Sequence, residues 1–164
     1  MPEKPSLTKP SVLFICTANQ CRSPMAEVLF RDLVSNLDPE TEWLISSAGC
    51  WARPNNAATQ TAVEVMKDRG INLEDHLSKP VTEDLLDRYN LILCMEEEHK
   101  RVIQRNFPSA KDKTFLLYEM IGKNQEIWDP IGMSKLGYEN TADEILKILN
   151  EGLEKISFLA SKQI

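Results

Sequence analysis

The sequence predicts an α/β protein, a three-layer sandwich in which a four-stranded parallel sheet carries helices on both faces. Four short segments are expected as strands, at residues 12–15, 42–47, 91–95 and 114–118. The first and third are continuously apolar, which is typical of strands buried on both faces. Helical patterns lie between the segments, and alternating strands and helices indicate a parallel sheet.

The chain is long enough for one domain with a substantial core. Its 164 residues contain no internal repeat and no linker that would separate a second domain. Residues 1–10 are polar and proline-rich, so we expect a flexible N-terminal arm followed by one domain at residues 11–164.

The first strand feeds directly into the first helix. The strand at residues 12–15 ends at Cys16, Ser23 is expected as the helix N-cap, and Pro24 suits the first helical turn. This helix should end near residues 36–39. The later elements follow in this order: a helix at 57–69 with Gly70 just beyond it, a loop at 72–80, a short helix capped by Thr82, a helix at 97–106, an irregular stretch at 119–137 and a helix at 140–160.

Composition excludes several functional classes. The net charge of −6 argues against general nucleic-acid binding, so an anionic ligand must be held by a local positive site. No apolar run approaches a membrane span, and no secretory signal pattern precedes the first strand. The cysteines at 16, 21, 50 and 94 show no metal-ligand spacing. We therefore expect a cytoplasmic protein with reduced thiols, no metal and no other cofactor.

The loop at residues 16–23 combines a thiol with an arginine at a helix N-terminus. Cys16 ends the strand and Arg22 follows six positions later, where helix N–H groups attract anions. Consecutive backbone N–H groups of a curled loop can bind phosphoryl oxygens, and a planar guanidinium adds a bidentate grip. Asn19 tolerates the left-handed conformation that such a curl needs. The helix and the cation would also stabilise a Cys16 thiolate.

The alternative is a small buried cysteine beside an unrelated surface arginine, but the whole pattern favours a nucleophilic anion site. Ligands of parallel sheets bind beyond the carboxyl ends of the strands. Cys16 and Gly49 both follow expected strands, so their loops should share that edge.

The stretch CTANQCRSPMAE resembles the signature loop of the low-molecular-weight protein tyrosine phosphatases, whose pattern is C-x5-R-S at the first strand–helix junction. The resemblance continues through Ser47-Ala48-Gly49, the loop at residues 72–82 and Trp128-Asp129-Pro130, and so covers nearly the whole chain.

This resemblance implies a reaction and assigns residues to it. Cys16 is expected to attack phosphorus and form a phosphocysteine, Arg22 to clamp the phosphate, and Asp129 to protonate the leaving oxygen and then activate water. The alternative for Asp129 is an Asx-turn before proline. The phosphate-binding loop would comprise Thr17, Ala18, Asn19, Gln20, Cys21, Arg22 and Ser23.

The resemblance also implies supporting residues. Ser23 should hydrogen-bond the thiolate, and a network that shapes the loop should join Asn19, Ser23, Ser47 and His76. A loop or core position is the alternative for His76. Trp51 and Trp128 are candidate walls for the substrate side chain, and ordinary partial burial is the alternative for Trp51. His99 receives no role.

Four positions bear on how this chain departs from the usual family pattern. Ala18 stands where the family usually has glycine, which bears on the loop geometry. Ile131-Gly132 resembles the bacterial branch, which includes protein arginine phosphatases, but the arginine-specific members carry threonine where this chain has Gln20. We therefore expect a monomeric phosphatase acting on phosphotyrosine in proteins or peptides and releasing phosphate, with arginine phosphatase as the alternative.

Two further alternatives stay open. An arsenate reductase would need resolving cysteines near residues 76–90, where this chain has none, and a non-catalytic phosphate-binding module would be expected to have a damaged site. Cys16 and Cys21 are close enough in sequence to form a reversible disulfide on oxidation.

Overall fold

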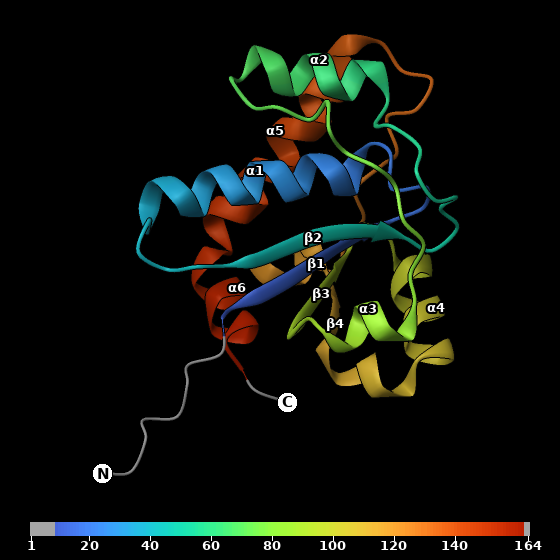
Figure 1. Cartoon of the computed structure of the whole chain (residues 1–164), viewed down its shortest axis with the longest axis vertical. Coiled ribbons are helices and arrows are strands. Elements are labelled where there is room, and N and C mark those ends of the chain that lie inside the picture. Colours follow the sequence, from blue (N-terminus) through green and yellow to red (C-terminus); the bar gives the residue numbers. More distant parts are fainter. Residues whose placement is uncertain (1–8, 163–164) are drawn as a thin grey trace.

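The computed structural model describes residues 9–162, so residues 1–8 of the expected arm lie outside the described residues. Four parallel strands form one sheet in the order β2-β1-β3-β4 (Figure 1). The strands are β1 (Ser11–Cys16), β2 (Leu44–Gly49), β3 (Leu91–Cys94) and β4 (Thr114–Leu116). The four-stranded parallel sheet predicted from the sequence is confirmed.

Helices cover both faces of this sheet, which confirms the predicted three-layer sandwich (Figure 1). One face carries α1 (Arg22–Leu37), α2 (Gln60–Asp68), α5 (Lys135–Glu151) and α6 (Leu153–Ala160). The other carries α3 (Glu83–Asp87) and α4 (Glu97–Asn106). Two short 3₁₀ segments, η1 (Pro108–Lys113) and η2 (Leu117–Ile121), flank β4.

Alternate side chains of β1 enter two separate cores. Val12 and Phe14 pack into the larger core under α1 and α5, whereas Leu13 and Ile15 pack into the smaller core with Ile103 of α4. All four β1 side chains are fully buried. This double burial explains the continuously apolar sequence of the strand.

Two expected element boundaries were wrong for reasons that the structure makes clear. Helix α1 begins at Arg22 with Cys21 as its N-cap residue, and the Ser23 side chain faces the site instead of capping the helix. The expected single helix at 140–160 is two helices that meet at Gly152. A Cβ at Gly152 would lie 2.9 Å from Cβ of Met120, so the chain passes η2 too closely for any other residue.

Smaller differences concern the remaining boundaries. Helix α2 starts at Gln60, not at residue 57, because Thr59 caps it by accepting from the Ala62 N–H. Gly70 has a φ of 76°, as expected for the residue that ends this helix. Strand β2 lies two residues later than predicted, β4 has only three residues, and α5 begins at Lys135.

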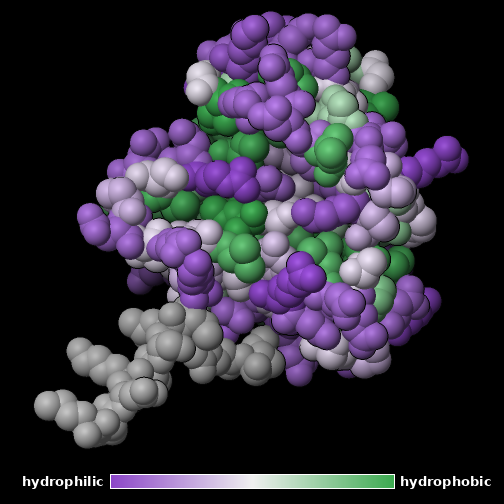
Figure 2. All heavy atoms as spheres, viewed as in Figure 1, coloured by the Kyte–Doolittle hydropathy of each residue, from purple (hydrophilic) through white to green (hydrophobic). Residues whose placement is uncertain are grey.

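The surface seen in Figure 2 is largely hydrophilic, with hydrophobic residues gathered in patches between the polar ones. Within residues 9–162, no helix combines the length and the apolar character that a membrane crossing requires.

Candidate active site

The loop between β1 and α1 is curled around a left-handed residue. Asn19 has a φ of 56°, and Asn55 is the other non-glycine residue with positive φ in the described chain. Ala18 is therefore not left-handed, so this position does not require glycine. None of the backbone N–H groups of residues 18–21 donates to a backbone carbonyl within the described residues. The loop thus presents donors of the kind that bind oxyanions.

The Cys16 thiol is held against a hydroxyl. Its Sγ lies 2.9 Å from Oγ of Ser23, and both residues are buried. Asn19 Nδ2 donates to that hydroxyl oxygen at 2.9 Å, so the Ser23 proton can point at the sulfur or at the Ala48 carbonyl oxygen, 3.4 Å away. A hydroxyl that donates to sulfur stabilises the thiolate, the form that attacks an electrophile.

Asn19 connects the loop to two other segments. Its Nδ2 also donates to Oγ of Ser47 at 2.9 Å, and Ser47 in turn donates to the Glu27 carboxylate at 2.8 Å. The Asn19 carbonyl accepts from Nε2 of His76 at 2.7 Å, and its Oδ1 accepts from the backbone N–H of Lys79 at 3.0 Å. The structure therefore brings together the four residues expected to form this network.

Gly49 at the end of β2 explains why the loop can lie so close to the sheet. A Cβ at Gly49 would lie 2.6 Å from the Thr17 carbonyl oxygen and 2.9 Å from the Asn19 nitrogen. Both contacts are with backbone, so neither could be relieved by rotating a side chain. The backbone N–H of Trp51 then donates to the Thr17 carbonyl at 2.9 Å and fixes the two loops together.

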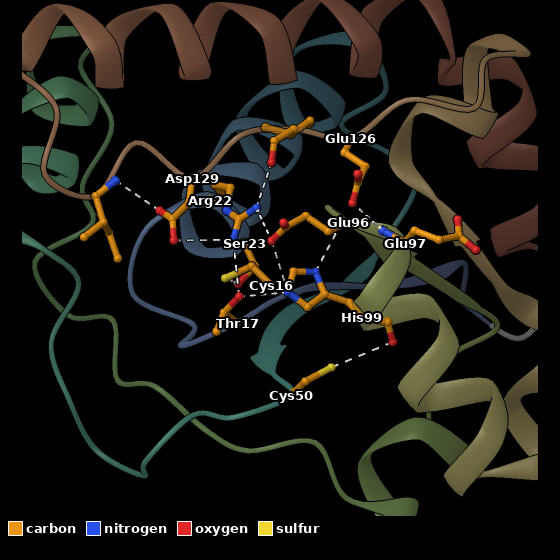
Figure 3. A network of polar contacts seen from close by, with 12 residues as sticks. Cys16, Thr17, Arg22, Ser23, Cys50, Glu96, Glu97, His99, Glu126 and Asp129 are labelled. Atoms are coloured by element: carbon orange, nitrogen blue, oxygen red, sulfur yellow. Dashed lines mark hydrogen bonds and ion pairs between the residues drawn. The ribbon is translucent and has the colours of Figure 1, made fainter.

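Arg22 is buried and held by groups distant in sequence (Figure 3). Its Nη1 donates to Glu96 at 2.8 Å and to the Ile127 carbonyl at 2.7 Å. Its Nη2 makes only longer contacts, 3.4 Å to Oγ1 of Thr17 and 3.6 Å to Oδ2 of Asp129. Since both Nη1 hydrogens are engaged, the Nη2 and Nε edge is the one available for an oxyanion.

Asp129 forms an Asx-turn and also lies at the hollow that contains the Cys16 thiol. Its Oδ1 accepts from the backbone N–H of Ile131 at 3.0 Å, which is an Asx-turn. Its other oxygen is the one that faces Arg22. A narrow hollow is lined by Cys16, Ala18, Gln20, Cys21, Arg22, Asp129 and Ile131. The Asx-turn therefore positions the carboxylate at the hollow that also contains the thiol.

The two tryptophans differ in their surroundings. Trp51 is half exposed and its ring centroid lies 6.1 Å from that of His99, whereas Trp128 is 83% exposed. Trp51 is thus anchored beside the loop, and Trp128 precedes Asp129 on a projecting segment. Gln20 points its amide at the Ala57 carbonyl, to which it donates at 3.0 Å.

Glu96 and His99 are site residues that the sequence reasoning missed. His99 is fully buried, and its Nε2 lies 2.9 Å from Oγ1 of Thr17. Burial, reinforced by the Arg22 charge, lowers the pKa of His99 to about 4. One signal was available: both residues follow β3, so they belong to the same sheet edge as Cys16.

The other thiols have different surroundings. Burial raises the pKa of Cys21 well above its usual range, and the nearby Cys16 and Asp129 charges add to this effect. All four cysteines are free, so a disulfide between Cys16 and Cys21 stays a prediction for oxidising conditions. Among residues 9–162, no group of three or more His, Cys, Asp or Glu side chains is placed to hold a metal ion.

Comparisons with known proteins agree with this geometry. Residues 11–159 match the family model described as low molecular weight phosphotyrosine protein phosphatase. A protein-arginine-phosphatase from Bacillus subtilis (strain 168) is 40% identical over 144 residues, which are 85% of this chain and 92% of that protein. The low molecular weight protein-tyrosine-phosphatase Etp from Escherichia coli (strain K12) is 30% identical over 90% of this chain and 95% of its own.

The solved structures show the same similarity. The low molecular weight protein tyrosine phosphatase from T. tengcongensis superposes with a TM-score of 0.84 at 38% identity, covering 88% of this chain and 98% of that one.

Proposed function

The chain belongs to the low-molecular-weight protein tyrosine phosphatase family and is a cysteine-dependent phosphatase, and we propose that Cys16, Arg22 and Asp129 carry out its reaction. One observation carries this assignment: the thiol, the guanidinium and the carboxylate line the same narrow hollow. The chain itself supplies all three groups, so the proposed reaction requires no second copy.

The first step transfers the phosphoryl group to sulfur. The Cys16 thiolate attacks phosphorus, a sulfur–phosphorus bond forms, and the bond from phosphorus to the leaving oxygen breaks. Asp129 gives its proton to that oxygen, while Arg22 and the loop N–H groups bind the phosphoryl oxygens. The Ser23 hydroxyl lies 2.9 Å from the sulfur and, by donating to it, would stabilise the attacking thiolate.

The second step hydrolyses the intermediate. Asp129, now ionised, takes a proton from a water molecule as the water oxygen attacks phosphorus. The sulfur–phosphorus bond breaks, inorganic phosphate leaves and the Cys16 thiolate is restored. The same carboxylate therefore serves as acid and then as base.

Hydrolysis of para-nitrophenyl phosphate tests this assignment. We expect wild type to be active, and Cys16→Ser to lose turnover while it keeps the fold and phosphate binding, because serine retains the size but not the nucleophile. Turnover is followed by release of nitrophenolate and folding by circular dichroism. An undiminished rate in Cys16→Ser would contradict the nucleophile assignment.

We propose phosphotyrosine in proteins or peptides as the substrate, with phosphoarginine as the second candidate. Phosphoarginine as the substrate is favoured by the 40% identical relative named a protein-arginine-phosphatase. It is opposed by Gln20, a bulky side chain lining the hollow where the arginine-specific members carry threonine. Trp51, half exposed beside the loop, offers a flat apolar wall suited to an aryl group.

Parallel rates on one peptide carrying either phosphotyrosine or phosphoarginine decide between these substrates. We expect a higher kcat/KM for phosphotyrosine. We also expect Gln20→Thr to shift the ratio toward phosphoarginine, with Gln20→Asn as the control that keeps an amide. A wild-type preference for phosphoarginine would reverse the assignment.

A further inference from the structure

A closed ring of polar contacts joins His99 to both terminal nitrogens of the Arg22 guanidinium (Figure 3). His99 Nε2 lies 2.9 Å from Oγ1 of Thr17 and 3.5 Å from Oε2 of Glu96. Arg22 reaches the same two oxygens, with Nη2 at 3.4 Å from Thr17 and Nη1 at 2.8 Å from Glu96. The atoms that face the imidazole are therefore the atoms that hold the guanidinium.

The backbone of α4 fixes which ring nitrogen carries the proton. The Glu96 N–H donates to Nδ1 of His99 at 3.2 Å. An amide N–H can only donate, so Nδ1 carries a lone pair and the hydrogen of the neutral ring lies on Nε2. His99 consequently donates to Thr17, and its Nδ1 cannot bind a proton without losing the contact that begins α4.

The surroundings keep the ring in this neutral form. Arg22 opposes a positive charge on His99, while the carboxylates of Glu96, Glu126 and Asp129 favour one. Burial outweighs these carboxylates and, with Arg22, lowers the pKa of His99 to about 4. The ring is fully buried and does not line the hollow, so it acts on the substrate only through its neighbours.

We propose that His99 is a positioning residue for the phosphate clamp: its Nε2–H fixes the Thr17 hydroxyl, which with Glu96 holds the Arg22 guanidinium in the orientation that grips the phosphoryl group. This inference rests on the proposed role of Arg22. Without the His99 donor, the Thr17 side chain can leave its present rotamer, and the Nη2 edge of Arg22 loses one of its two long contacts.

The two halves of the imidazole can be removed separately. His99→Asn places an oxygen near the Nδ1 position, which keeps an acceptor for the Glu96 N–H but removes the donor to Thr17. His99→Gln places an amide N–H near the Nε2 position, which keeps that donor. Thr17→Val removes the acceptor at nearly constant volume. Ile103→Val is the stability control, because Ile103 is also buried on α4 but packs into the core and makes no contact in the ring.

Phosphate affinity is the decisive measurement because it does not depend on turnover. The dissociation constant of inorganic phosphate is measured by calorimetry, together with kcat, KM and Tm for each variant. We expect His99→Asn and Thr17→Val each to weaken phosphate binding by about five- to tenfold, the usual worth of one hydrogen bond. His99→Gln should recover most of the phosphate affinity. Ile103→Val should lower Tm but leave the phosphate affinity unchanged.

Coupling between the two side chains gives a second readout. If His99 acts through Thr17, the double variant Thr17→Val/His99→Asn binds phosphate no more weakly than the weaker single variant. Above pH 5.5 the pH profile of kcat/KM should keep its shape in His99→Asn, because the ring donates a hydrogen bond and transfers no proton.

Several results would overturn the inference. If His99→Asn binds phosphate as tightly as wild type, His99 does not position the clamp. The same conclusion follows if the two single variants' losses of affinity multiply in the double variant. If His99→Asn fails to fold, Thr17→Val still tests the link, and unchanged affinity there counts against it. An inactive wild type that binds phosphate contradicts the proposed function alone, whereas one that does not bind phosphate contradicts both.

Discussion

At the scale of single residues, the arrangement around Asp129 shows how a short turn can fix one oxygen of a carboxylate. One carboxylate oxygen is occupied by the Ile131 N–H and the other faces Arg22. The turn restricts the side chain, and Oδ2, the oxygen that faces Arg22, is the one that would carry and transfer the proton in the proposed reaction. In the proposed reaction, the turn and the proton transfer would therefore use different oxygens of the same carboxylate.

Replacement of Asp129 separates these two uses. Asp129→Asn keeps an oxygen that can accept from Ile131 but cannot act as an acid, and Asp129→Ala removes both. We expect each to lower kcat on para-nitrophenyl phosphate by roughly two to four orders of magnitude, the usual contribution of general acid–base catalysis. Steady-state rates at neutral pH measure this, and a full rate in Asp129→Asn would place the acid elsewhere.

The sequence indicated which side chains meet at the hollow, but not every residue that holds them there. Cys16, Arg22 and Asp129 carry recognisable motifs, and the structure brings them to one hollow. His99 belongs to no such motif, since a histidine after three glutamates is typical of a polar helix start, and only its position after β3 indicated the site. Its burial depends on packing between α4 and the loop, and no local pattern encodes that contact.

At the scale of elements, the ends of β1 and β2 set the position of the phosphate loop. The backbone carbonyl of Thr17, in the loop between β1 and α1, lies very close to Gly49. The last residue of β2 must therefore lack a side chain. Continuous apolar runs predicted the buried strands, and the spacing of apolar residues predicted where helices occur. The break at Gly152 was not predicted, since an isolated glycine in a helical pattern does not reveal that Met120 lies close to it in the fold.

Gly49→Ala tests this close approach. Its Cβ would push against the backbone of Thr17 and Asn19, so we expect a loss of roughly 1–3 kcal/mol in the free energy of unfolding and a clear fall in kcat/KM. Urea unfolding and steady-state kinetics measure the two effects.

Gly70→Ala is the matched control for this prediction. Gly70 has positive φ but open space around it, so alanine there should cost stability while kcat/KM stays unchanged. Equal kinetic losses in both variants would show that the Gly49 contact is not specific to the loop.

At the scale of the whole molecule, stability should depend on pH through His99. Its pKa is about 4 in the folded protein and 6.5 for an unperturbed histidine. Below pH 6.5 the unfolded chain therefore binds a proton that the folded protein does not, and this favours unfolding. The free energy of unfolding should fall by up to about 3 kcal/mol as the pH falls from 6.5 to 4, and the titration of His99 should not change it above that range.

Urea unfolding of wild type and His99→Gln across pH 4.5–7.5 measures this contribution. His76 is present in both proteins, so the difference between the two curves reports His99. The difference should widen as the pH rises from 4.5 toward 6.5 and then stay constant. Parallel curves throughout this range would contradict the prediction.

The connection of Arg22 to the Ile127 carbonyl, 105 positions away along the chain, has a consequence for protein synthesis. The cysteine loop is made early, but Glu96, His99, Ile127 and Asp129 leave the ribosome much later. A nascent chain therefore exposes its thiol before the groups that hold the arginine exist. Phosphatase activity should begin only when the segment preceding α5 has been translated and has docked against the loop.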